Sequence, residues 1–184
     1  MINNKGSLLL ILGCMFSGKS TAIIHYARKY KAIKKKILII KHIYDNRYAD
    51  NHISSHNLDK EPCITMNDLN NSFDDDKYKN ADIIIIEEAQ FFKSLVIPIN
   101  KMVDIHNKTV IVCGLNGDFK RNNFGDIRNL LPYVDNIHYC KALCSICNNG
   151  TEAIFSKKIT DNNNQVDIGS NDSYIPVCRE HYNS

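Results

Sequence analysis

The sequence predicts an α/β fold built on a parallel sheet. Apolar runs recur at residues 7–12, 37–40, 83–86 and 109–113, and more weakly at 134–139, and each is long enough for one strand. Helix-length or loop-length segments separate the runs, which is typical of crossover connections. The runs are continuous rather than alternating, so we expect helices on both faces of the sheet. A chain of 184 residues has room for one such domain and a small appendage.

Composition excludes several other classes of protein. The chain is 43% apolar and 23% charged, and its net charge of +3 is too small to indicate nucleic-acid binding without a clustered basic stripe. No apolar run approaches the length of a membrane span, and the short apolar stretch near the N-terminus leads into a glycine loop rather than a cleavage site. The 7 cysteines are an odd number. Together these features predict reduced, metal-bound or buried thiols in a cytoplasmic protein with no membrane or direct nucleic-acid partner.

The first strand is followed by a phosphate-binding motif. Residues Gly13 to Ser20 spell G-C-M-F-S-G-K-S, which matches the P-loop pattern G-x-x-x-x-G-K-[ST]. Residues 21–34 after it predict a helix. The residues expected on its buried face are Ile23, Ala27, Tyr30 and Ile33.

Strand, loop and helix N-terminus together predict an anion cradle. Backbone N–H groups converge there, and the helix dipole favours negative charge. Lys19 would reach the outer phosphates of a nucleotide, and the Ser20 hydroxyl would bind magnesium. An ordinary glycine-rich turn is the alternative, and the flanking strand and helix make it the weaker one.

A second nucleotide motif follows the third apolar run. Ile83 to Ile86 are succeeded by Glu87 and Glu88, and we expect this strand to end beside the glycine loop. A carboxylate in that place holds magnesium directly or through water. Since adjacent residues of a strand point to opposite faces, one acid would organise magnesium and the other would serve as base. A pair of solvated acids is the alternative, which the upstream loop disfavours.

The remaining chain divides near residue 140. Residues 94–107 predict a helix with Pro98 in its first turn, and the polar residues 45–80 predict a long loop, or a loop with a weak helix. After residue 140 glycine, asparagine and cysteine dominate and the apolar runs shorten. We therefore expect a nucleotide-binding domain at 1–140 and a small lobe at 141–184.

Two ligand pairs in that lobe predict zinc. Cys144-x-x-Cys147 and Cys178-x-x-His181 each place two ligands on a tight turn, as a closed tetrahedral site requires. Unligated cysteines are the alternative, and the tight spacing of both pairs argues against it. The other cysteines lack such spacing and are expected to be buried apolar residues. These are Cys14, Cys63, Cys113 and Cys140.

At this point a family resemblance becomes specific. The segment E-E-A-Q-F-F at residues 87–92 resembles the D-E-[GA]-Q-F-F segment of type II thymidine kinases, and the loop resembles their G-x-M-F-[SA]-G-K-[ST]. I-K at 40–41 with D-x-R at 45–47, and the G-L-N-G-x-F…F-G pattern at 114–125, resemble further segments of the family in the same order. The resemblance covers residues 8–182 and implies a P-loop (RecA-like) domain with a zinc-bound lobe.

The resemblance implies a reaction and the residues that carry it. It is transfer of the γ-phosphoryl of ATP to the 5′-hydroxyl of thymidine, or of deoxyuridine, in DNA precursor synthesis. Glu88 matches the catalytic base, Lys19 the phosphate-binding lysine and Arg47 an arginine that neutralises the moving phosphoryl. The set expected around ATP and magnesium is Gly13, Cys14, Met15, Phe16, Ser17, Gly18, Lys19, Ser20, Thr21, Asp45, Glu87 and Gln90.

For thymidine, the resemblance implies an apolar slot covered by a loop of the lobe that reads the base through backbone groups. The set expected there is Met15, Leu115, Phe119, Phe124, Ser156, Gln165, Val166, Asp167, Ile168, Gly169 and Tyr174. Plain core packing is the alternative for each aromatic residue. Two positions depart from the family pattern, because Glu87 replaces an aspartate and Ser170 replaces a glycine. A homotetramer and feedback inhibition by thymidine triphosphate are also implied.

Two other classes of function compete with a kinase. A nucleic-acid-dependent ATPase would use the lobe as a zinc ribbon, but the chain lacks a second motor domain and a basic groove. A non-catalytic nucleotide sensor would lack the catalytic carboxylate, and Glu88 is present.

Overall fold

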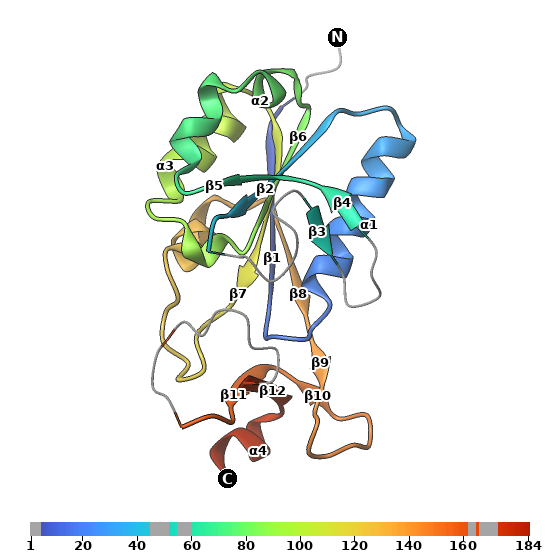
Figure 1. Ribbon diagram of the computed structural model, residues 1–184, viewed down its shortest axis with the longest axis vertical. Helices are drawn as coiled ribbons and strands as arrows, with labels where there is room; N and C mark the ends of the chain where they lie inside the picture. The colour runs from blue at the N-terminus through green and yellow to red at the C-terminus, as the bar shows by residue number, and fades with distance from the viewer. Residues whose placement is uncertain (1–4, 45–51, 55–59, 162–164, 166–172) are drawn as a thin grey trace.

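The computed structural model describes residues 5–44, 52–54, 60–161, 165 and 173–184. Its central feature is a six-stranded parallel sheet in the order β5-β2-β6-β7-β1-β8 (Figure 1). The strands are β1 (Ser7–Gly13), β2 (Ile37–His42), β5 (Ile64–Met66), β6 (Ile83–Glu87), β7 (Thr109–Leu115) and β8 (Asn136–Cys140). The predicted parallel α/β fold is confirmed.

Helices cover both faces of the sheet, which accounts for the continuous apolar runs. Helix α1 (Lys19–Ala32) packs Ile23, Ile24 and Ala27 on one face, against alternate residues of the strands such as Ile39 and Ile85 (Figure 1). The other face holds Leu38, Ile84 and their neighbours. The elements that cover it are η1 (Leu69–Asp74), α2 (Asp76–Asn80), α3 (Val96–Asn100), the π-helical turn η3 (Lys101–Ile105) and η4 (Ile127–Tyr133).

Two expectations about these elements need correction. The segment 45–80 is not one loop, because it contains β3 (His52–Ser54), β4 (Lys60–Pro62), β5, η1 and α2. Helix α1 ends at Ala32, so Ile33 caps it and is 64% exposed instead of facing the core. Strand β7 lies between β6 and β1, and the end of β6 nevertheless reaches the glycine loop, because Ser20 Oγ donates a hydrogen bond to Glu87.

The strand pair β3–β4 explains why a polar segment is ordered. Its strands are antiparallel, and Ile53 joins the apolar cluster formed with α1. Glu61 on β4 forms an ion pair with Lys31 of α1. The buried Ile53 side chain and the Glu61–Lys31 ion pair thus hold against α1 a ribbon whose composition is otherwise that of a loop.

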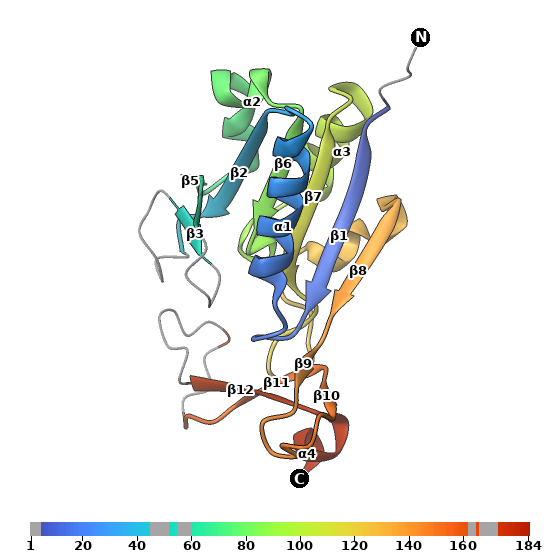
Figure 2. The ribbon, with the colours of Figure 1, turned by 90° about the vertical axis from the view of Figure 1, so that its right-hand side faces the viewer.

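The lobe after residue 140 lies beyond the carboxyl ends of the sheet strands (Figures 1 and 2). It contains the antiparallel pairs β9 (Ala142–Leu143) with β10 (Glu152–Ala153) and β11 (Phe155–Lys158) with β12 (Tyr174–Val177), followed by α4 (Arg179–Asn183). Its apolar cluster includes Ala142, Ala153 and Val177, and it also contains Cys14 from the glycine loop. The lobe therefore packs directly against that loop.

His42 at the end of β2 predicts a pH dependence of stability. Its ring is buried against Phe92 at a centroid distance of 4.8 Å, and its Nδ1 accepts a hydrogen bond from the Tyr44 N–H at 3.1 Å. Burial lowers the pKa of His42, and a hydrogen bond with the Asn67 backbone offsets this only in part. Because the folded pKa lies below the unfolded value, the neutral ring stabilises the fold above about pH 6.5 and this stability is lost as the pH falls below it. Urea unfolding between about pH 7 and pH 5 should therefore show a decline that is smaller in His42→Gln; equal slopes would contradict this assignment.

Candidate active site and cysteine–histidine cluster

The glycine loop between β1 and α1 has the backbone of an anion site. Phe16 and Gly18 have positive φ values of 62° and 81°, and such turns direct successive N–H groups into one concavity. Gly18 also precedes the first turn of α1 with no side-chain cap, which leaves the helix N-terminus open to an anion. A Cβ atom on Gly13 would lie 2.5 Å from the Cys140 carbonyl oxygen, so only glycine fits there.

The polar side chains of this loop are bonded to the loop itself. Lys19 Nζ donates to the Cys14 carbonyl at 2.7 Å, and Ser17 Oγ donates to the same oxygen at 2.8 Å. The Lys19 ammonium therefore lies directly over the cradle. A phosphate entering the loop would replace the carbonyl oxygen as its acceptor.

Ser20 and Glu87 meet at the carboxyl edge of the sheet. Ser20 Oγ in the first turn of α1 donates to Glu87 Oε1 at 2.8 Å, although β7 separates the strands that lead to the two residues. Glu87 is buried, at 4% exposure. A hydroxyl and a carboxylate are hard oxygen ligands of the kind that magnesium prefers, so this pair fits that ion.

Glu88 is held by its own backbone and by Gln90. Its φ of 49° is in the left-handed region, which a residue with a Cβ atom adopts only at a cost in energy. Its Oε2 accepts a hydrogen bond from Gln90 Nε2 at 2.5 Å, and Gln90 Oε1 accepts one from the Leu115 N–H at 3.1 Å. The buried Gln90 amide thus ties the carboxylate to the end of β7.

Gln90→Leu tests this link. The substitution leaves the Leu115 N–H without its acceptor, which costs about 1–3 kcal/mol of stability, and it frees the Glu88 side chain. Although Gln90 was expected near ATP, its amide contacts Glu88 and the Leu115 N–H. We therefore expect the rate of phosphoryl transfer to fall by about tenfold or more with little change in ATP binding. Steady-state kinetics and ATP titration check this, and a variant with lower stability but a normal rate would show that Gln90 is structural only.

Two of the aromatic residues expected around the base contact each other, and a third contacts an aromatic residue outside the expected set. Phe119 and Tyr174 lie with centroids 6.2 Å apart, and the Lys158 ammonium is 5.1 Å from the Phe119 ring. Phe124 is buried and packs edge-to-face on Phe91 at 5.5 Å. Phe91 was not among the residues selected from the sequence. It is one of two adjacent phenylalanines, of which Phe92 is fully buried in the core and Phe91 is only partly buried. A pair of neighbouring aromatic residues, of which only one can face the core, could have pointed to Phe91.

Within the part of the chain that the structure describes, two hydrogen bonds join the lobe to the glycine loop. The Met15 N–H donates to Ser156 Oγ at 2.9 Å, and Cys14 Sγ donates to the Ala153 carbonyl at 3.5 Å. On the β7 side, Gln165 Nε2 donates to Asp118 Oδ2 at 2.9 Å. Ser156 and Gln165 therefore come close to the loop that follows β1 and to the one that follows β7.

The structure does not describe every residue that the sequence argument selected. Outside the described residues lie Asp45, Arg47, Val166, Asp167, Ile168, Gly169 and Ser170. Their expected roles stay predictions.

A shallow groove of about 860 Å³ runs from the glycine loop between α1 and β8. Ser17, Gly18 and Thr21 line the end near the loop, and Tyr26 and His138 lie farther along, with their rings edge-to-face at 6.4 Å. The groove is open to solvent and continuous with the anion cradle. It has room for a group attached to a bound phosphate.

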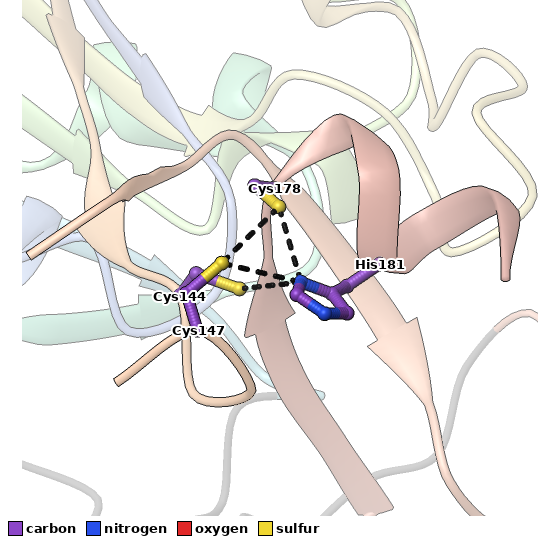
Figure 3. A group of neighbouring side chains, drawn as sticks. All are labelled: Cys144, Cys147, Cys178 and His181. Carbon is purple, nitrogen blue, oxygen red and sulfur yellow. Dashed lines mark hydrogen bonds between the residues drawn. The ribbon is translucent and has the colours of Figure 1, made fainter. Parts of the chain in front are cut away.

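Three cysteines and a histidine converge in the lobe (Figure 3). Their ligand atoms lie within 4.8 Å of one another, with Cys147 Sγ 3.7 Å from Cys178 Sγ and 3.2 Å from His181 Nδ1. Tetrahedral zinc with bonds of about 2.3 Å to sulfur and 2.0 Å to nitrogen requires separations of about 3.8 Å and 3.5 Å. The predicted set Cys144, Cys147, Cys178 and His181 therefore has the spacing of a tetrahedral metal site.

The backbone around this cluster favours a thiolate. Burial raises the pKa of Cys144, but hydrogen bonds from the backbone of Cys147, Cys178 and Ile146 outweigh it and lower the pKa to about 6. The thiolate is the form that binds metal. The cysteines outside the cluster are all buried, as predicted.

The fold and this site define a P-loop nucleotide-binding protein with carboxylates opposite the loop. Comparison with known proteins is consistent with that class and narrows it, because residues 6–182 match the thymidine kinase family. The chain belongs to the thymidine kinase family, and its kind of activity is that of a kinase.

Named relatives agree with this assignment. A thymidine kinase of Amsacta moorei entomopoxvirus is 39% identical over 184 residues, which cover 97% of this chain and 98% of the relative. A fowlpox virus thymidine kinase is 36% identical over 96% of this chain and 97% of its own length. A rice thymidine kinase is 36% identical over 96% of this chain, which spans 66% of that relative. Within the described residues, no helix is long and apolar enough to cross a membrane.

Proposed function

We propose that this protein transfers the γ-phosphoryl group of ATP to the 5′-hydroxyl of thymidine, and of deoxyuridine, to supply DNA precursors. The observation that carries the proposal is the meeting of the glycine loop, the Ser20–Glu87 pair and the Glu88–Gln90 pair at one edge of the sheet. Phosphoryl transfer needs phosphate binding, charge neutralisation and a base near the acceptor, and this edge offers all three.

Each group has a role that follows from its position. The loop N–H groups and Lys19 hold the β and γ phosphates, since Lys19 Nζ lies over the cradle at the Cys14 carbonyl. Glu88 accepts the proton of the 5′-hydroxyl as transfer proceeds. Arg47, the arginine of the D-x-R segment, neutralises charge on the moving phosphoryl.

Two metals belong to the proposal. Ser20 and Glu87, with Asp45, hold magnesium, which when bound offsets the charge of the phosphates. Cys144, Cys147, Cys178 and His181 hold a structural zinc ion with no open position.

The nucleosides occupy separate places. We assign the donor's sugar and base to the groove between α1 and β8, because it continues directly from the loop that binds the donor's phosphates. The thymine lies among Met15, Leu115, Phe119, Phe124 and Tyr174, near Ser156. In this proposal residues 165–169 cover the thymine. The chain then consists of a nucleotide-binding domain at 1–140 and a lobe at 141–184 that supplies this covering segment.

The decisive experiment is phosphoryl transfer from ATP with thymidine, deoxycytidine, deoxyguanosine or no nucleoside as acceptor. Magnesium-dependent thymidine monophosphate, with little product from the other nucleosides, is the expected result. ATP hydrolysis that needs no nucleoside and rises with DNA would overturn the proposal in favour of a DNA-dependent ATPase.

The resemblance extends the proposal to assembly and control. We propose a cytoplasmic homotetramer that thymidine triphosphate inhibits as an end product. The outer edge of the sheet suits contact between copies, because β8 is an unpaired edge strand within the described residues, with Ile137 51% and Tyr139 41% exposed.

A further inference from the structure

Lys41, near the end of β2, is a buried cation whose ammonium makes no hydrogen bond to any described residue. Its side chain is 0% exposed, and among the described residues its Nζ is the one buried side-chain nitrogen or oxygen that makes no hydrogen bond. Burying an unpaired ammonium is strongly unfavourable, so proteins pair such groups. Lys108 shows the usual case, because it is also buried but donates to the Ala81 carbonyl at 2.6 Å.

Strand periodicity places Lys41 on the side of the sheet that bears the glycine loop. Ile39, two residues earlier, packs in the cluster that contains α1, and alternate residues of a strand share a face. Lys41 pairs in register with Glu87 of β6, and Glu87 accepts the hydrogen bond from Ser20. The ammonium is therefore beside the corner that fits magnesium and phosphate.

Strand order decides which phosphate Lys41 can meet. From β1, which carries the loop, three steps through β7 and β6 lead to β2, a distance of about 14 Å at 4.8 Å per strand. The loop backbone holds the donor's inner phosphates close to β1. A cation on β2 is therefore placed to meet the outermost phosphoryl group. Glu88, the proposed base, lies beside this position, because it directly follows the Glu87 that pairs with Lys41.

We propose that Lys41 is a catalytic residue that binds the transferred phosphoryl group, as the γ-phosphoryl of the donor and then as the phosphate of the product. The unpaired ammonium is a preformed anion contact, which costs stability in the free protein and is satisfied when the phosphoryl group arrives. This inference rests on the proposed function. It adds a residue that neither the loop motif nor the carboxylate motif includes.

The test compares thymidine with thymidine monophosphate, which differ only in the phosphoryl group. Their affinities are measured by calorimetry for the wild type, Lys41→Gln and Lys41→Met, with Lys108→Gln as a second buried lysine far from the site. Lys41→Gln should lose about tenfold or more in affinity for the monophosphate, the cost of a charge-assisted hydrogen bond, and bind thymidine normally. Lys108→Gln should keep the wild-type ratio of the two affinities.

Thermal unfolding of the free proteins is a second measurement, in which the Lys41 and Lys108 substitutions should shift Tm in opposite directions. Lys41→Met removes an unpaired buried charge and should raise Tm, whereas Lys108→Gln breaks a made hydrogen bond and should lower it. If the Lys41 variants keep the wild-type ratio of affinities for thymidine monophosphate and thymidine, or if they fail to fold, Lys41 has a structural role only. If the wild type binds thymidine but binds the monophosphate no more tightly, the Lys41 contact alone is overturned. If the wild type binds neither compound, the proposed function is overturned as well.

Discussion

Replacing Glu88 by Gln is expected to lower the rate of phosphoryl transfer by about 10²- to 10⁴-fold, the usual contribution of a positioned general base. The amide has the shape of the carboxylate, and its carbonyl oxygen still accepts the hydrogen bond that Gln90 Nε2 donates to Glu88 Oε2. The positive φ of 49° suits Gln no worse than Glu. ATP and thymidine should therefore bind normally while turnover is lost, as rapid-quench kinetics and calorimetry would report.

A matched control separates loss of the base from loss of a charge. Asp76 is an exposed acid on α2, and its one ion pair within the described residues is a contact of 3.4 Å with Lys79. Asp76→Asn removes one negative charge and should leave the rate unchanged. A Glu88→Gln enzyme that turns over like this control would mean that another group takes the proton.

Loss of a cluster ligand is the second large effect. Cys147→Ser should release the metal and disorder the lobe, because structural zinc sites contribute about 10–16 kcal/mol of apparent binding energy to folding in zinc-finger peptides. Activity should fall as well, since Ser156 of the lobe accepts a hydrogen bond from the Met15 N–H of the glycine loop, and the Ala153 carbonyl accepts one from the Cys14 thiol of the same loop. Metal content by mass spectrometry, hydrogen exchange and a kinase assay measure the three consequences.

The control for this prediction is a cysteine outside the cluster. Cys63 is buried in the cluster formed with α1, so Cys63→Ser should cost some stability but keep the metal and the activity. Extraction of the wild type with a strong chelator should reproduce the Cys147→Ser pattern. A metal-free wild type that keeps an ordered, active lobe would refute a structural metal.

The sheet was predictable because its strands are marked in the chain itself. The run Ile83–Ile86 is apolar at every position, and a strand covered on both faces needs such a run. The cluster was predictable because two ligands on one tight turn are a local pattern. In both cases the information lies within a few consecutive residues.

What the sequence argument missed depends on contacts between distant segments. The place of β7 between β1 and β6 follows from its pairing with both strands, with Thr109 opposite Ser7 on one side and opposite Ile83 on the other, and no local pattern encodes it. The ribbon β3–β4 is ordered by contacts of Ile53 and Glu61 with α1, although its composition predicts a loop. The link from Gln90 to the Leu115 N–H likewise joins two segments that the motifs treat separately.

The hydrogen bond between the Met15 N–H and Ser156 Oγ also has a thermodynamic meaning. Met15 belongs to the loop assigned to the donor, and Ser156 lies on the strand pair whose connecting chain is assigned to the acceptor. If one ligand shifts this contact and so strengthens the binding of the other, reciprocity requires the second to strengthen the first by the same factor. Coupling between the two substrates would then depend on this contact between the glycine loop and the lobe, and not on either binding site alone.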